Sequence, residues 1–217
     1  VTVLMFKGLE VDDKLITFWT SLILLPWTLK PLWSPFLELF RTKKFFVIVT
    51  QLITGVTFGL VAFALNLSHF FSISIALLAI VAFSGATHDI ACDGVYMSEL
   101  SNEDQAKFIG WQGAFYNIAK ILATGGLVYL AGYFIELNAD AGLLTANKRA
   151  WMIILLILSV TMILLGIYHL FALPSTQSAS SRKTLRSNKE VMKELGQVLM
   201  DFFRKTHITY YICFIIL

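Results

Sequence analysis

The chain has 217 residues, of which 57% are hydrophobic and only 14% charged, and its formal net charge is +3. Soluble domains carry about 25% charged residues, so this composition excludes a soluble protein and predicts an all-α, polytopic membrane protein. The basic excess lies mostly in loops, where it reports membrane topology and does not indicate nucleic-acid binding.

Apolar segments long enough to cross a bilayer recur along the chain, since a transmembrane helix needs about 20 residues. We expect five complete spans, over residues 14–38, 45–67, 71–98, 108–134 and 151–173. Residues 1–6 resemble the last turns of a further helix, and the chain stops inside another apolar run. We therefore expect a fragment of a longer protein.

Three regions follow from this pattern: a transmembrane half over residues 1–173, a linker over 174–205 and the start of a further span over 206–217. The linker is rich in Ser, Thr, Lys and Arg. Its second part, residues 190–205, repeats apolar residues at helical spacing with charged residues between them. That pattern predicts an amphipathic helix on a membrane surface.

The placement of Lys and Arg predicts the orientation of the chain. Of the 17 basic residues, 11 fall in the loops near residues 41–44 and 107 and in the linker, four fall in the opposite loops, and Lys30 and Lys120 lie inside spans. Basic residues concentrate on the cytoplasmic side, so the first set of loops is predicted to be cytoplasmic.

Ionisable residues inside the apolar segment 71–98 are the strongest functional signal. Residues 84–96 include His88, Asp89 and Asp93, and the two carboxylates lie one helical turn apart on one face. Such groups cost several kcal/mol in hydrocarbon and normally face a protein interior or a water-filled path.

Two interpretations of these charges stay open. In the structural one, Lys30 pairs with one of the carboxylates, and His88 is a hydrogen-bonded interior residue. In the functional one, Asp89 or Asp93 takes up and releases a proton during transport, or forms a gate, with Lys30 as its partner. His88 could then carry a proton as well.

A second polar cluster lies in the segment 108–134. Gln112, Tyr116 and Lys120 follow one another at four-residue spacing and form a stripe on an apolar helix, with Asn117 beside it. Such a stripe suits a cavity for a polar, anionic solute; packing against partner helices is the alternative. The glycines of this segment indicate a helix that either packs closely or bends.

The order of these features resembles the first half of a transporter of the major facilitator superfamily. Residues 34–44, SPFLELFRTKK, resemble the loop between its helices 2 and 3, with Glu38 as the acidic residue and Arg41, Lys43 and Lys44 as the basic cluster. The resemblance implies a six-helix half-bundle with its first helix truncated and the start of helix 7 present.

A narrower resemblance covers two helices. Residues 25–35, LPWTLKPLWSP, look like the helix 2 pattern of AmpG-type muropeptide permeases, and residues 86–94, ATHDIACDG, look like their helix 4 pattern. His88 stands where that family is expected to have an amide, and Gly94 where it has alanine. The resemblance implies proton-coupled uptake of anhydromuropeptides across the bacterial inner membrane.

The expected function is therefore secondary transport without a cofactor or a metal. The expected partners are the lipid bilayer, a small polar solute, protons and the missing C-terminal half. One alternative keeps the fold but carries another solute: a sugar, a peptide or a nucleotide thioester. Another is an integral-membrane lipid enzyme with a metal on the acidic pair, which the lack of further ligands nearby disfavours.

Overall fold

A computed structural model of the chain describes residues 1–40 and 42–174, the side chains of residues 35, 36 and 38–40 excepted, together with isolated positions between 193 and 210. This described part is helical and contains no strand. Its elements are α1 (Thr2–Gly8), α2 (Asp13–Ile23), α3 (Leu25–Phe40), α4 (Lys43–Ala64), α5 (Phe70–Glu99), α6 (Asn102–Ile121), η1 (Leu122–Gly126), α7 (Leu127–Leu137), η2 (Ala139–Ala141) and α8 (Leu143–Ala172).

Five stretches of helix are long and apolar enough to cross a membrane. They cover Asp13–Ser34, Lys43–Ala64, Phe70–Glu99, Asn102–Leu137 and Leu143–Ala172. The number and the approximate places of the predicted spans are thereby confirmed, and the chain is an all-α, multi-pass membrane protein.

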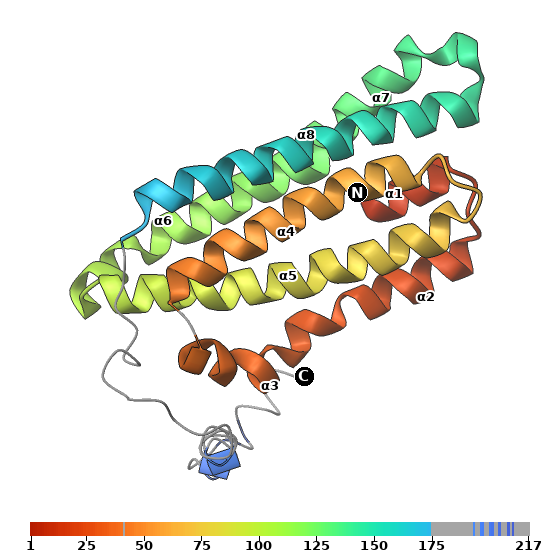
Figure 1. Ribbon diagram of the computed structural model, residues 1–217. Helices are drawn as coiled ribbons and strands as arrows, with labels where there is room; N and C mark the ends of the chain where they lie inside the picture. Colours follow the sequence, from red (N-terminus) through yellow and green to blue (C-terminus); the bar gives the residue numbers. More distant parts are fainter. Residues whose placement is uncertain are drawn as a thin grey trace.

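Helix α4 lies at the centre of the bundle, with α5 along one side and α8 along the other (Figure 1). Helices α2 and α3 cover the far side of α5. The buried core includes Phe6 of α1, Ile16 of α2, Val61 of α4 and Ile154 of α8. Helix α1 is therefore part of the packed bundle although it has only seven residues.

Small and hydroxyl-bearing residues bring α4 close to both neighbours. A Cβ on Gly55 would lie 2.7 Å from Cγ1 of Ile163 and 3.0 Å from the carbonyl oxygen of Ser159, both in α8. On the other side, Thr54 Oγ1 donates to Ser84 Oγ of α5 at 3.1 Å. Close backbone approach and interhelical hydrogen bonds are the usual means of helix association in membranes.

The predicted span 14–38 is not one straight helix, since the chain breaks between α2 and α3 at Leu24. Proline lacks an N–H and its ring clashes with the carbonyl four residues earlier, so Pro26 cannot continue the helix from Leu22. The Leu24 amide donates instead to the carbonyl of Ser21 at 3.2 Å. Helix α3 consequently starts in a new direction (Figure 1).

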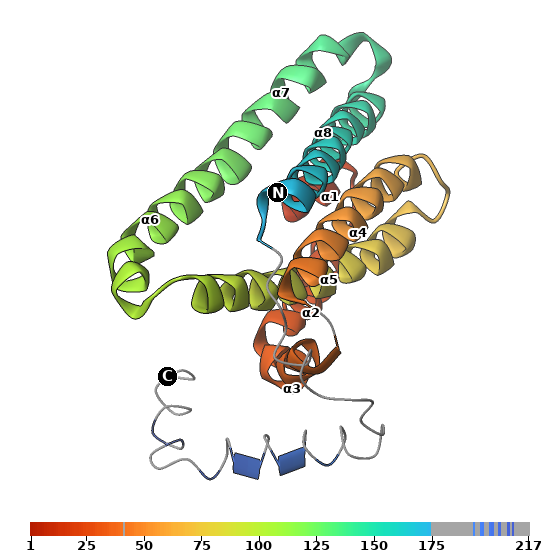
Figure 2. The same ribbon diagram turned by 60° about the vertical axis from the view of Figure 1, so that its left-hand side comes forward.

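The predicted span 108–134 is continuous from α6 through α7 but contains the π-helical turn η1 at Leu122–Gly126. Helix α6 has no buried residue and lies apart from the bundle, whereas α7, which continues it, packs along α8 (Figure 2). A Cβ on Gly110, Gly113 or Gly125 would meet no atom within 4 Å. Among the described residues these three glycines therefore make no close packing contact.

The predicted linker and the start of the next span fall almost wholly outside the described residues. The exceptions within 190–205 are isolated positions that are helical and exposed, among them Lys193, Met200 and Arg204. The predicted amphipathic helix and the boundaries at 174, 205 and 206 stay predictions.

Candidate functional site

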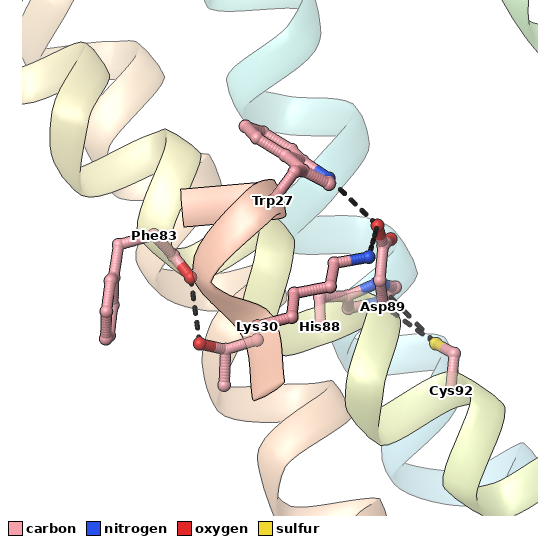
Figure 3. A network of polar contacts seen from close by, with 7 residues as sticks. Trp27, Lys30, Phe83, His88, Asp89 and Cys92 are labelled. Carbon is pink, nitrogen blue, oxygen red and sulfur yellow. Dashed lines mark hydrogen bonds and ion pairs between the residues drawn. The ribbon is translucent and has the colours of Figure 1, made fainter. Parts of the chain in front are cut away.

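The contact between α3 and α5 joins charged and polar side chains within two of the predicted spans. Lys30 Nζ lies 2.9 Å from Asp89 Oδ2, and Trp27 Nε1 donates to the same oxygen at 3.0 Å (Figure 3). Both α3 side chains therefore converge on one carboxylate oxygen. Among the described residues, no side chain donates to Oδ1 of Asp89.

Local sequence explains how α3 presents these two donors. Trp27 and Lys30 are three residues apart, so they share one helical face. Gly85 stands one turn before Asp89 on α5, and a Cβ there would lie 3.2 Å from the Trp27 ring. The missing side chain lets the indole lie against α5 while its N–H reaches the carboxylate.

The site is half-buried in the isolated chain. The Lys30 side chain is 27% exposed and that of Asp89 is 47% exposed. Apolar groups adjoin it, since Trp33 of α3 stacks on Phe83 of α5 with ring centroids 4.7 Å apart. A lysine and a carboxylate that lie this deep in apolar helices stabilise each other, because each would be costly in hydrocarbon alone.

The two acidic residues have different surroundings despite their regular spacing. Asp93 is exposed and, within the described part of the chain, makes no hydrogen bond or ion pair. Its neighbour Gly94 is buried beneath the Lys43 side chain of α4, whose Cδ would lie 2.7 Å from a Cβ on that glycine. Of the two acidic residues, Asp89 is therefore the one that pairs with Lys30.

Among the described residues, His88 makes no hydrogen bond to either carboxylate. Its ring nitrogens lie 3.5 and 3.6 Å from Cys92 Sγ, one turn further along α5 (Figure 3). Cys92 is half-buried and is not in a disulfide. The geometry agrees with the interpretation of His88 as an interior residue that contacts its own helix, and its role as a proton carrier stays a prediction.

The predicted solute-binding stripe lies on a different part of the molecule. Gln112, Tyr116, Asn117 and Lys120 are all exposed on α6, and Asn117 Nδ2 donates to the carbonyl of Gly113 at 2.8 Å. No hydrogen bond or ion pair between described side chains joins this stripe to the α3–α5 contact. The two candidate clusters are therefore separate.

The predicted basic loop is described only in part. Arg41 and the Glu38 side chain lie outside the described residues, while Lys43 and Lys44 open α4. Lys44 Nζ donates to the carbonyl of Leu173 at 2.6 Å, which ties the start of α4 to the end of α8. Gln51 Oε1, 2.8 Å from His169 Nδ1, joins the same two helices.

Trp27 is the site residue that reasoning from the sequence missed. The chain contains five tryptophans, and tryptophan is common at membrane interfaces, so its residue type alone does not single out Trp27. The available signal was its spacing of three residues from Lys30, which places both side chains on one face.

Comparisons with protein-family models, with curated proteins and with solved structures give no match to this chain. Among the described residues, no three His, Cys, Asp or Glu side chains gather closely enough to hold a metal ion. The geometry offers a paired carboxylate that a proton can neutralise, at the contact between two membrane helices.

Proposed function

We propose that the chain is one half of a secondary transporter of the major facilitator type, which carries a polar solute together with protons into the cytoplasm of a bacterium. The observation that carries this proposal is the ion pair between Lys30 and Asp89 at the α3–α5 contact. A pair of opposite charges between two membrane helices makes their contact depend on protonation, because a neutral carboxyl group no longer attracts the lysine.

The place of the pair along α5 supports a coupling role. Asp89 precedes the end of α5 at Glu99 by ten residues, which corresponds to about 15 Å at 1.5 Å per residue. Because the 30 residues of α5 are longer than a bilayer core of roughly 30 Å, part of that distance lies outside the core, and the carboxylate lies inside the core in the half nearer to Glu99. Rocking of two halves can expose such a site to each side of the membrane in turn.

The proposed solute is an anhydromuropeptide or a related product of cell-wall turnover. The support for this class is the resemblance of residues 25–35 and 86–94 to AmpG-type permeases. The exposed stripe on α6 then faces the solute pathway between the halves. In this arrangement Lys120 binds a carboxylate of the solute, while Gln112 and Asn117 bind its amide and hydroxyl groups.

The test is uptake of a labelled anhydromuropeptide by vesicles that contain the complete transporter and are more acidic outside than inside. We expect accumulation that collapses when a protonophore removes the gradient. Unlabelled sugar, peptide or nucleotide thioester is added in parallel, and competition by one of these alone would reassign the solute. Absence of gradient-driven uptake of every solute in the panel would contradict the proposal.

Lys120→Met tests the assignment of the stripe. Loss of a charge-assisted hydrogen bond to a solute carboxylate should raise KM by about tenfold or more, since such a bond contributes roughly 1.5–3 kcal/mol. The matched control is Lys107→Met, at an exposed position near the start of the same helix. Equal KM values for the two variants would contradict a solute contact at Lys120.

A further inference from the structure

Trp27 packs on Gly85 and donates a hydrogen bond to Asp89, and the ion pair with Lys30 alone does not explain this arrangement. Trp27 Nε1 lies 3.0 Å from Asp89 Oδ2, the oxygen that Lys30 also contacts at 2.9 Å. Gly85, one turn earlier on α5, leaves room for the indole ring. Figure 3 shows Trp27 and Lys30 reaching the carboxylate from the same helix.

The chemistry of the two donors decides which form of Asp89 they stabilise. An indole N–H and an ammonium group donate hydrogen bonds and accept none. A carboxylate accepts stronger hydrogen bonds than a carboxylic acid does, so two donors on Oδ2 favour the ionised form of Asp89 even though Oδ1 is open to a proton. Separation of α3 from α5 would remove both donors and thereby favour protonation.

We propose that Trp27 is a positioning residue that, seated on Gly85, holds Asp89 ionised against Lys30 for as long as α3 stays packed on α5. The inference deepens the proposed coupling role of Asp89. It adds that proton uptake is tied to movement of α3, because the same contact that joins the helices favours the ionised form of Asp89.

Ionisable groups on the helices around α5 set the background of any titration. Lys30 is the ionisable side chain of α3 that the structure describes, and Lys43 of α4 lies over Gly94. On α5 itself, Cys92 interacts with Asp89 and Asp93, and His88 interacts with Asp89 and with His169 of α8. The charged residues of α2, Asp13 and Lys14, lie in its first turn, where Asp13 pairs with Lys7 of α1. None of these groups is altered by a substitution at Trp27.

The experiment measures protonation of Asp89 directly, in the complete protein in lipid vesicles and without any solute. A hydrophobic carbodiimide reacts with protonated carboxyl groups in apolar surroundings, and fragment mass spectrometry separates a label on Asp89 from one on Asp93. The extent of labelling is measured from acid to alkaline pH for the wild type and each variant.

Trp27→Phe keeps an aromatic ring on Gly85 and removes the N–H donor. We expect its labelling midpoint for Asp89 to move to higher pH by about one unit, a tenfold change in proton affinity, since a hydrogen bond to a charged group is worth roughly that much. Gly85→Ala leaves the indole intact but displaces the ring by a few tenths of an ångström, and should shift the midpoint in the same direction by less.

Trp33→Phe is the matched control. Trp33 lies on the same helix and packs on the same neighbour, but among the described residues its buried Nε1 has no hydrogen-bond partner. Its midpoint should equal that of the wild type. Equal labelling midpoints for Trp27→Phe and Trp33→Phe would overturn the proposal. If Trp27→Phe fails to fold, a Gly85→Ala variant whose midpoint equals that of the wild type would overturn it instead.

This result is independent of transport activity. A shifted midpoint in a protein that moves no solute would leave the positioning role intact and contradict only the proposed function. Proton-driven uptake with no shift of the midpoint in Trp27→Phe or Gly85→Ala would support the proposed function and contradict the positioning role of Trp27.

Discussion

Asp89 and Asp93 show how one helical turn separates two chemically identical side chains. Both lie on the same broad face of α5, but Asp89 meets Lys30 and Trp27 of α3, whereas Asp93 is exposed. Lys30 therefore belongs to Asp89 in this conformation. The pairing also makes Asp89 the carboxylate whose neutralisation would loosen the α3–α5 contact.

A double-mutant cycle tests that pairing. Lys30→Met and Asp89→Asn should each destabilise the protein, and the double variant should lose less than the sum, because neither charge is left without its partner. We expect a coupling free energy of about 1 kcal/mol, reduced by the partial exposure of both groups. The measurement is thermal unfolding of the purified protein in detergent. Additive losses of stability would contradict the ion pair. A second cycle with Lys30→Met and Asp93→Asn is the control, and its losses should be additive.

The sequence predicts the intramembrane charges but does not decide between the two acids. Their spacing places both on one face, and the choice depends on the rotation and tilt of α3, which follow from the break at Leu24. Trp27 escapes prediction for the same reason, since its partner lies 62 positions away in the sequence. The spacing of residues predicts which of them share a face of a helix, whereas their partners on other helices depend on how the helices pack.

At the scale of helices, α4 is held by close contacts with two neighbours, whereas α6 is held near its start, where Tyr96 Oη of α5 donates to the carbonyl of Gln105 at 2.7 Å. Gly55, with Ile163 and the Ser159 carbonyl close to it, marks the tight crossing of α4 and α8. Helix α6 has no buried residue, and its glycines have open space. The described structure thus contains a tight group formed by α4, α5 and α8 and a loosely attached helix that bears the polar stripe.

Paired glycine substitutions test this contrast. Gly55→Ala should destabilise the protein by about 1–3 kcal/mol, because the added methyl group meets a backbone carbonyl that cannot move without shifting α8. Gly113→Ala should be neutral or stabilising by up to about 1 kcal/mol, since it enters open space in a helix interior. Melting temperatures of the two variants provide the comparison. Equal effects would contradict the close crossing of α4 and α8.

The helices themselves were predictable from the sequence, and their irregularities only in part. Long apolar runs predict the spans because the bilayer leaves few alternatives to helices. Pro26, Pro31 and Pro35 all remove a backbone donor, but the chain breaks only before the first of them. Likewise, glycines predict either packing or bending in the segment 108–134, whereas the π-helical turn at Leu122–Gly126 is seen only in the structure.

For the whole molecule, the distribution of Lys and Arg predicts which loops face the cytoplasm. The α5–α6 turn and the start of α4 fall on the predicted cytoplasmic side, and the α7–α8 connection falls on the opposite side. The five spans agree with these alternating sides, since an odd number of crossings separates the turn before α4 from the connection before α8.

Single-cysteine labelling tests this topology after Cys92 and Cys213 are replaced by alanine. Glu103→Cys and Asp140→Cys place thiols at exposed positions on the two predicted sides. An impermeant maleimide added to spheroplasts should label Asp140→Cys at once and Glu103→Cys only after the membrane is permeabilised. The opposite order would invert the topology and place Asp89 in the outer half of the membrane.

The most direct test of proton coupling through Asp89 is proton flux driven by the solute itself. Vesicles that contain the complete transporter and an internal pH dye are given anhydromuropeptide outside, with no imposed pH gradient. We expect acidification of the interior by the wild type and none by Asp89→Asn, while solute exchange between the two sides persists in that variant. Solute uptake without acidification, or equal acidification by Asp89→Asn, would contradict proton coupling through Asp89.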